Sequence, residues 1–447
     1  MKKTFIAVAL ISFLTFGLAS CGGEQYDDTL VVYNWEDYID DGKDEDGNYD
    51  HESVIEIFEK EYLEETGRTI KVEYQTFSTN EDMYNMIKLG SLKADLICPS
   101  DYMIQKMARE DMLEKFSFDT STHKYGDDLD NYNKYASPYL KDLFERNSFS
   151  SYAIPYTWGT MGLTYNYSAI EDNNIDLTTW DCLWDSALKG KVTVKDSVRD
   201  TYFTAVMHVY KSELVSLKNM LENGEITRES YTEAITEIFN RCDDETLEKC
   251  KQALIDLKSN IKALEVDDGK NDITSGSLYA NLAWSGDAVY SMDIADEVGK
   301  VQLNYIIPEE GSNIWFDGWC MPKGANVDLA TKFTNFLSRP DIAAKNMNFT
   351  GYTSSIAGDD IFDLATEWYS AEEGDENVDE VDLSYFFEGT LSEGKKAIFL
   401  ISKDERGRQF DAQYPDEDTI SRCAIMKDFG IQTDKLNAMW SDFKNSF

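Results

Sequence analysis

Three tryptophans near the ends of predicted strands stand two or three residues before an aspartate. The pairs are Trp35 with Asp37, Trp284 with Asp287, and Trp315 with Asp317. An indole face holds methylene groups and attracts an ammonium group by about 0.5–2 kcal/mol. A carboxylate binds the ammonium through charge-assisted hydrogen bonds, without which burying that charge would be prohibitive. The pairs therefore favour a site for an alkyl diammonium, and the alternative is that the three indoles only fill a core.

The elements that must position these pairs begin with an alternation of strands and helices. The apolar pattern predicts strands over 30–33, 69–74 and 94–98, and helices over 53–65 and 82–89. This order predicts a mainly parallel sheet with helices on both faces. Ligands bind such sheets at the carboxyl ends of the strands. The segments at the predicted ends are Asn34 to Tyr38 and Ser100 to Tyr102.

A second α/β region is expected from about Ser151 onwards. Further strands are predicted over 191–194, 304–307 and 318–321, and another is predicted to end at 282–284. A helix is predicted over 333–337 and ends at Arg339-Pro340, and the C-terminal part is predicted to be helical. Each tryptophan–aspartate pair would then lie at a strand end. Residues 211–265 are highly charged with apolar positions at helical spacing, which predicts outer helices. They are either a docking surface or an elaboration of the fold.

Two acidic segments, 40–50 and 372–382, are expected to be inserted loops. The first contains Asp44-Glu45-Asp46-Gly47, as a calcium loop would. Placing Gly47 at the sixth position puts Gly42 first and Ser53 twelfth, where acidic residues are required. A solvated acidic loop is therefore the favoured interpretation, and no metal site is predicted.

The N-terminus has the pattern of an export signal. Lys2 and Lys3 precede an apolar run over 4–19, and Leu18-Ala19-Ser20-Cys21 follows. Small residues before a cysteine resemble the lipobox of bacterial lipoproteins, in which that cysteine is acylated. The alternative is an ordinary secretory signal with an accidental cysteine. We expect an exported chain, anchored through Cys21 lipid to the outer face of the cytoplasmic membrane or in the periplasm.

Composition bounds the remaining possibilities. The 447 residues carry a net charge of −42, which disfavours nucleic acid and anionic lipid and favours cationic partners. Without Cys21, six cysteines remain, and an even number in an exported chain permits disulfides of undetermined connectivity. Cys242 and Cys250 are expected on one helix, separated by about 12 Å of rise, too far to bond unless the helix breaks. No catalytic motif, zinc spacing or nucleotide-binding loop occurs in the sequence, so no cofactor is expected.

Six motifs occur in an order that carries a resemblance. They are Asn34-Trp35-Glu36-Asp37-Tyr38, Cys98-Pro99-Ser100-Asp101-Tyr102, Tyr152-Ala153-Ile154-Pro155-Tyr156-Thr157-Trp158-Gly159, Ala283-Trp284-Ser285-Gly286-Asp287, Ile314-Trp315-Phe316-Asp317 and Thr350-Gly351-Tyr352. The chain resembles the spermidine/putrescine-binding proteins of bacterial ABC importers. The likeness covers nearly all of the chain after the signal segment, apart from the insertions.

The resemblance implies a hinged, two-lobed α/β fold of the type 2 periplasmic binding protein kind, with a mainly parallel sheet in each lobe. Residues 1–20 would be the signal peptide. Lobe 1 would comprise 21–151 plus 315–360, and lobe 2 would comprise 152–314 plus 361–447. The hinges are expected near 151–152, near Ile314 and near 357–362. The protein would be a monomer that captures a polyamine and delivers it to a permease and ATPase complex, without being an enzyme.

The resemblance also implies the ligand-binding residues. They are Trp35, Asp37, Tyr38, Ser100, Tyr102, Asp200, Trp284, Asp287, Trp315, Asp317 and Tyr352. Asp37 and Asp287 match the putrescine branch of the family. Three positions depart from the family pattern: Glu36, Ser197 and Met426. They leave the choice between putrescine and spermidine open, and Ser100 is equally suited to capping a helix.

Two other functions remain as alternatives. Cys98 and Cys320 lie near the expected cleft, so a cysteine-dependent enzyme on the same fold is conceivable, although no histidine is placed by the sequence to activate either thiol. A sensor that presents a bound cation to a membrane receptor is the second alternative.

Overall fold

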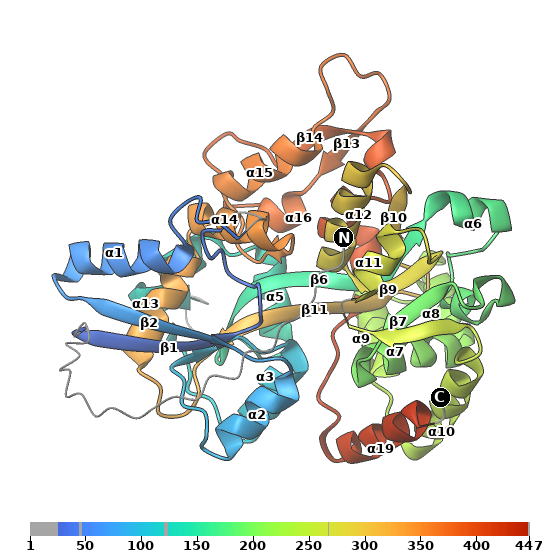
Figure 1. The fold of residues 1–447 in the computed structure, drawn as a ribbon, viewed down its shortest axis with the longest axis horizontal. Helices are drawn as coiled ribbons and strands as arrows, with labels where there is room; N and C mark the ends of the chain where they lie inside the picture. Colours follow the sequence, from blue (N-terminus) through green and yellow to red (C-terminus); the bar gives the residue numbers. More distant parts are fainter. Residues whose placement is uncertain (1–25, 44–46, 120–123, 267, 446–447) are drawn as a thin grey trace, which may run out of the picture.

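The computed structural model describes residues 26–43, 47–119, 124–266 and 268–445. The expected signal segment and Cys21 lie outside the described residues. One hydrogen-bonded path of strands organises the chain, in the order β2-β1-β3-β11-β6-β9-β7-β8. In Figure 1, β6 (Ala153–Asn166) and β11 (Ser312–Cys320) cross the centre of the molecule between two outer groups of strands. They pair antiparallel with each other, whereas the outer strands pair parallel.

We call the first outer group the β1 half. Its strands are β1 (Asp28–Asn34), β2 (Ile70–Thr76) and β3 (Leu96–Ile97). Helix α1 (Val54–Thr66) covers one side of them, and α2 (Asn80–Lys88) and α3 (Asp101–Arg109) cover the other (Figure 1). Further helices of this half are α4 (Asp130–Tyr135), α5 (Pro138–Arg146), α13 (Val327–Leu337) and α14 (Pro340–Thr350). A short pair, β4 (Phe118–Asp119) with β5 (Lys124–Tyr125), completes it.

We call the second outer group the β7 half. Its strands are β7 (Val192–Lys195), β8 (Ile261–Glu265), β9 (Ala280–Trp284) and β10 (Leu303–Ile306). Its helices are α6 (Tyr167–Asn173), α7 (Val198–Val209), α8 (Lys211–Glu222), α9 (Arg228–Phe239), α10 (Asp244–Leu257), α11 (Asp268–Thr274), α12 (Ser285–Val298) and α19 (Thr433–Lys444). Helices α8 to α10 confirm the outer helices expected there, but Leu264 lies in β8 and not in a helix.

The segment after α14 adds β12 (Thr353–Ser354), α15 (Asp359–Tyr369), α16 (Ser384–Phe387), α17 (Gln409–Gln413), α18 (Glu417–Ser421) and β15 (Cys423–Ala424). It also forms a hairpin of β13 (Val378–Asp382) and β14 (Ile398–Ser402), which projects at the top of Figure 1. The expectation of a loop over 372–382 was therefore wrong for its second half. Val381 is buried there, and this apolar position anchors the hairpin.

Two clusters of buried apolar side chains hold the fold together. One surrounds β1 and extends to Ile361 and Phe386, and the other surrounds β7, α10 and α19. Ile361 and Phe386, which were assigned to lobe 2, belong to the first cluster, and the lobe boundaries stay a prediction. The mixed α/β architecture agrees with the fold class expected from the sequence.

The structure corrects two expectations, one about the acidic segment at Asp40 and one about a single helix that carries Cys242 and Cys250. Asp40 belongs to a segment expected to be solvated, yet it is buried with a carboxylate oxygen 2.8 Å from His51 Nε2. Cys242 lies between α9 and α10, so the helix does break before Cys250. In the part of the chain that the structure describes, all six cysteines are buried free thiols. The described ranges contain no group of three or more potential ligands that could hold a metal ion, and no helix apolar and long enough to cross a membrane.

The start of α1 is fixed by a capping box. The Ser53 hydroxyl accepts a hydrogen bond from the Glu56 amide, and the Glu56 carboxylate accepts one from the Ser53 amide. We expect Ser53→Ala to lower the free energy of unfolding by about 1 kcal/mol, because the Glu56 amide loses its acceptor. Urea titration followed by circular dichroism measures this. Ser53→Thr keeps the cap and should recover most of the loss; an Ala variant as stable as the parent would contradict the prediction.

Candidate binding site between the two halves of the sheet

The centre of the site lies on the two crossing strands. Asp317 pairs with Thr157 and Trp315 pairs with Gly159 across β11 and β6. The sequence placed Trp315 and Asp317 before a strand starting at Gly318, but β11 already begins at Ser312. A register shift between Asp317 and Gly318 interrupts the pairing at this point. The pair therefore lies within a strand, unlike Trp35, which follows β1, and Trp284, which ends β9.

Asp317 is a buried carboxylate surrounded by hydroxyl groups. Only 6% of it is exposed, and Oδ2 accepts a hydrogen bond of 2.7 Å from the Tyr38 hydroxyl. The Ser100 hydroxyl is also a hydrogen-bonding partner. Burial raises the pKa of Asp317 to about 6, against the lowering effect of these two hydroxyls. Among the described residues, no lysine, arginine or histidine forms an ion pair with it.

Ser100 stands at the N-cap position of α3, but its side chain does not cap the helix. Its hydroxyl instead accepts a hydrogen bond of 3.0 Å from Asn80 Nδ2 and lies against Asp317. The helix-capping alternative therefore does not describe what this side chain contacts. The Tyr102 hydroxyl contacts the same Asn80 amide at 3.1 Å.

Three aromatic rings continue from Asp317 towards a second carboxylate. The Tyr352 ring lies 5.5 Å from the rings of both Tyr38 and Trp315. A side chain on Gly159 would collide with Trp315, and one on Gly286 would collide with Tyr352, so both glycines are needed for this packing. The Tyr352 hydroxyl donates a hydrogen bond of 2.9 Å to Asp287 Oδ1.

Asp287 differs from Asp317 in its electrostatic surroundings. It is 5% exposed, at the first turn of α12. Its Oδ2 lies 3.3 Å from Lys195 Nζ, and its Oδ1 lies 3.5 Å from Lys270 Nζ. Cations of the chain therefore neutralise Asp287, while the groups that contact Asp317 in the described ranges are neutral.

Asp200 lies beside Trp284 at the start of α7. It is buried, and its side chain has hydrogen-bonding partners in Ser197 and Trp284. Burial raises the pKa of this carboxyl above its ordinary value, and Lys195 and Arg199 oppose the effect. Asp200 thus belongs to the same polar group as the other two aspartates.

Besides Lys195 and Lys270, sequence reasoning missed two further charged residues of the site. Asp101 is 2% exposed and its Oδ2 has no hydrogen-bond partner among the described residues, and burial raises its pKa to about 8. The Arg199 guanidinium lies 4.1 Å from the centroid of the Tyr102 ring and 4.4 Å from that of Phe429. Asp101 stands inside a quoted motif directly after Ser100, and Arg199 directly precedes Asp200, so adjacency was the available signal. Through Arg199, the β7 half contacts α3 of the β1 half.

Some expected residues lie outside this group. Asp37 is exposed, with a positive φ of 51°. Glu36 is exposed as well, so its acid does not enter the buried group. Trp35 is half-buried and packs against Phe77 at 4.6 Å between ring centroids. Met426, the third departure from the family pattern, is buried in the apolar cluster around β7.

The two cysteines near the site have properties that disfavour nucleophilic chemistry. Cys98 and Cys320 are completely buried, and burial raises the pKa of both thiols well above the ordinary value. A thiol in such surroundings stays protonated and is a poor nucleophile.

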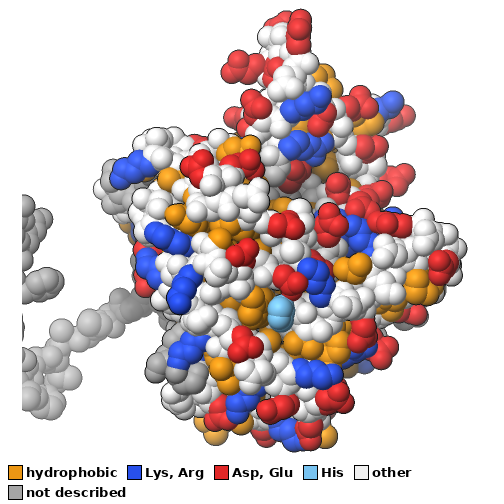
Figure 2. All heavy atoms as spheres, turned by 90° about the vertical axis from the view of Figure 1, so that its right-hand side faces the viewer, with side chains coloured by type: hydrophobic (Ala, Val, Ile, Leu, Met, Phe, Trp, Pro, Cys, Tyr) orange, Lys and Arg blue, Asp and Glu red, His pale blue; other side chains and the backbone are white. Residues whose placement is uncertain are grey.

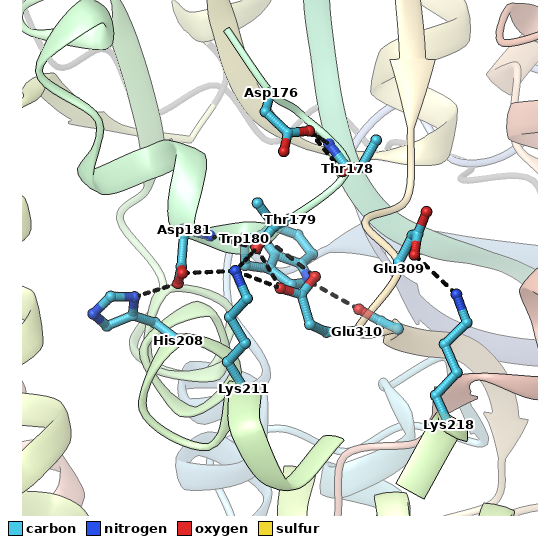
Figure 3. Close-up of polar contacts among 11 residues, drawn as sticks. Asp176, Thr178, Thr179, Trp180, Asp181, His208, Lys211, Lys218, Glu309 and Glu310 are labelled. Atoms are coloured by element: carbon cyan, nitrogen blue, oxygen red, sulfur yellow. Dashed lines mark hydrogen bonds and ion pairs between the residues drawn. The ribbon is translucent and has the colours of Figure 1, made fainter. Parts of the chain in front are cut away.

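A polar cluster outside the site fixes the entry to β11 (Figure 3). Glu310 contacts the Thr179 hydroxyl, and Trp180 Nε1 donates a hydrogen bond of 2.8 Å to the Gly311 carbonyl. Lys211 Nζ bridges Thr179 and Asp181 at 2.7 and 2.8 Å. The strand that carries Trp315 and Asp317 is therefore anchored to the β7 half two residues before it starts.

Residues 54–368 match the family described as bacterial extracellular solute-binding proteins. The chain belongs to this family. It is 28% identical over 354 residues to a spermidine/putrescine-binding periplasmic protein of Salmonella typhimurium, covering 79% of this chain and 84% of the relative. It is 25% identical over 364 residues to a putrescine-binding periplasmic protein of Escherichia coli, with 79% and 84% covered.

A solved structure is similar over almost the whole chain. It is described as a putative spermidine/putrescine ABC transporter from Listeria monocytogenes and superimposes with a TM-score of 0.63 at 26% identity, covering 94% of this chain and 99% of that one. These findings confirm the resemblance and the fold class expected from the sequence. The family is one of solute-binding proteins.

Proposed function

We propose that this protein captures a polyamine, putrescine or spermidine, between the two halves of its sheet and delivers it to the permease and ATPase complex of an ABC importer. The observation that carries the proposal is the pairing of a buried, uncompensated Asp317 with an aromatic wall of Tyr38, Trp315 and Tyr352. A primary ammonium would neutralise the carboxylate, and the rings would hold the methylene chain. The names of the relatives support the same ligand class.

The proposed ligand-binding set is the one expected from the sequence. Its buried members are Tyr38, Asp200, Asp287, Trp315 and Asp317. Trp35, Ser100, Tyr102, Trp284 and Tyr352 are half-buried, and Asp37 is exposed. Binding would draw the two predicted lobes together about hinges near 151–152, Ile314 and 357–362, because a bound cation relieves repulsion among facing carboxylates.

The proposal includes the location and state of the protein. The chain would be exported, carry lipid on Cys21 and act outside the cytoplasmic membrane as a monomer. The periplasmic location named for the relatives supports export. Acidic side chains lie among basic ones on the face in Figure 2, and a net charge of −42 favours cationic solutes over anionic partners.

Isothermal titration calorimetry tests the proposal. The purified protein, stripped of bound ligand, is titrated with putrescine, cadaverine, spermidine and spermine. One-to-one binding of at least one of them with a Kd in the micromolar range or below is the expected result. No heat with any of them, on protein shown to be folded and free of ligand, would overturn the proposed function.

A further inference from the structure

The ammonium of Lys195 lies inside the candidate site, at the end of β7. The residue is 1% exposed, and Nζ donates a hydrogen bond of 2.8 Å to the Val266 carbonyl. The same nitrogen lies 3.3 Å from Asp287 Oδ2 and 3.4 Å from Glu265 Oε1. A buried lysine is costly unless it is paired in this way, so Lys195 is held by a defined set of acceptors.

Lys195 also contacts the indole that was expected to hold a ligand. Its Nζ lies 4.4 Å from the centroid of the Trp284 ring, within cation–π range. A carboxylate and an indole together are the surroundings that the site was expected to offer to one end of an alkyl diammonium. At the Asp287 end of the site, the ammonium of Lys195 already contacts both a carboxylate and an indole.

The position of Lys195 does not depend on Asp287 alone. Glu265 is fixed independently, because its carboxylate accepts hydrogen bonds of 2.9 Å from Asn281 Nδ2 and from the Gly269 amide. The Val266 carbonyl supplies a further acceptor from the backbone. Lys195 is therefore held by Glu265 and the Val266 carbonyl as well as by Asp287.

We propose that Lys195 is a specificity-determining residue, whose ammonium takes the place of a ligand's second ammonium at Asp287 and Trp284. The inference rests on the proposed function of amine capture. A ligand then gains most of its electrostatic stabilisation from one ammonium at Asp317, and a second ammonium adds little. Lys270 also reaches Asp287, at 3.5 Å, but its side chain is 25% exposed, so solvent weakens its effect.

The test compares a monoamine with a diamine of the same length. Calorimetry of n-butylamine and putrescine gives the ratio of their dissociation constants, which measures what the second ammonium contributes. We expect a ratio below tenfold, after correction for the two equivalent ends of putrescine. In Lys195→Met the ratio should rise at least tenfold, because Asp287 becomes available. Adding Asp287→Asn to that variant should return the ratio to the parent value.

The matched control is Lys262→Met. Lys262 lies on β8, in the same half of the sheet, and pairs with Asp272 at 2.6 Å on the surface. The Lys262→Met variant removes the same charge but makes no change at Asp287. Its ratio of n-butylamine to putrescine dissociation constants should therefore stay within about twofold of the parent. Circular dichroism checks folding. If Lys195→Met does not fold, Lys195→Gln is used in its place, because glutamine keeps a hydrogen-bond donor for the Val266 carbonyl.

Two results would overturn the inference while leaving the proposed function in place. One is a parent protein that binds putrescine over 100-fold more tightly than n-butylamine. The other is a folded Lys195 variant whose ratio of n-butylamine to putrescine dissociation constants equals that of the parent. Failure of the proposed function looks different, since neither amine would then bind the parent, or binding would persist unchanged in Asp317→Asn.

Discussion

Asp317→Asn is expected to weaken polyamine binding more than 100-fold and, at the same time, to make the ligand-free protein more stable. Asparagine keeps the shape of the side chain but removes the only buried carboxylate in this group that lacks a cationic neighbour among the described residues. Losing a desolvated charge pair costs about 3 kcal/mol of binding free energy, which corresponds to more than 100-fold in Kd. Calorimetry with putrescine measures this part of the prediction.

The gain in stability follows from the sign of the pKa shift. An aspartate has a pKa near 3.8 when unfolded, and burial raises that of Asp317 to about 6. The folded protein thus holds the proton more tightly, and stability is lost as the pH rises from about 4 to about 6. At pH 7 the ionised group costs on the order of 3 kcal/mol, which the neutral amide avoids. The melting temperature without ligand should therefore rise by a few degrees.

The control for both effects is Asp328→Asn. Asp328 is an exposed aspartate in the first turn of α13, so this variant changes the net charge equally without altering the buried group. Its affinity and its melting temperature should stay near those of the parent. Retention of affinity within a few-fold by Asp317→Asn would show that the central carboxylate of the site has been misassigned.

Polyamine affinity is expected to fall steeply as the pH drops through 6. A proton and an ammonium compete for Asp317, whose pKa burial raises to about 6. Below that pH, each unit should weaken binding about tenfold, because only the ionised carboxylate binds the ammonium. Above pH 6 this residue contributes no further gain. Titrations with putrescine at half-unit intervals from pH 4.5 to 8.5 measure the profile.

Asp101 provides a means of assigning that pH dependence. Burial raises its pKa to about 8, so its titration affects the upper part of the profile. Asp101→Asn should remove any slope between pH 7 and 8.5 and keep the break near 6. Asp317→Asn should remove the break near 6. A break that survives in the Asp317 variant would assign the proton to another group.

The sequence predicted the site better where a motif ends an element than where it lies within one. Trp35 and Trp284 follow or end apolar runs, and both were placed at strand ends correctly. Trp315 and Asp317 lie within β11, where Asp317 and Gly318 separate two short apolar runs, so the pattern did not reveal one continuous strand. The pairing of Asp317 with Tyr38 joins residues 279 positions apart, so only the resemblance could predict it.

Charge compensation was the part that the sequence could not predict. Asp287 and Asp317 have the same neighbour types in the sequence, a tryptophan two or three positions earlier. Their surroundings differ because β7 and α11 bring Lys195 and Lys270 to Asp287, whereas neither lysine forms an ion pair with Asp317. Neither lysine belongs to a quoted motif. Which buried carboxylates still carry an uncompensated charge depends on the tertiary contacts.

The position of Lys195 has a consequence for how solute preference can diverge during evolution. Lys195 is the last residue of β7, which is not one of the two crossing strands. It also lies outside all six motifs. A single codon change there can add or remove a charge in the site while the motif residues and the crossing strands stay intact. Paralogues that share every motif can therefore have different substrates, so position 195 is informative when a ligand is transferred from one member of the family to another.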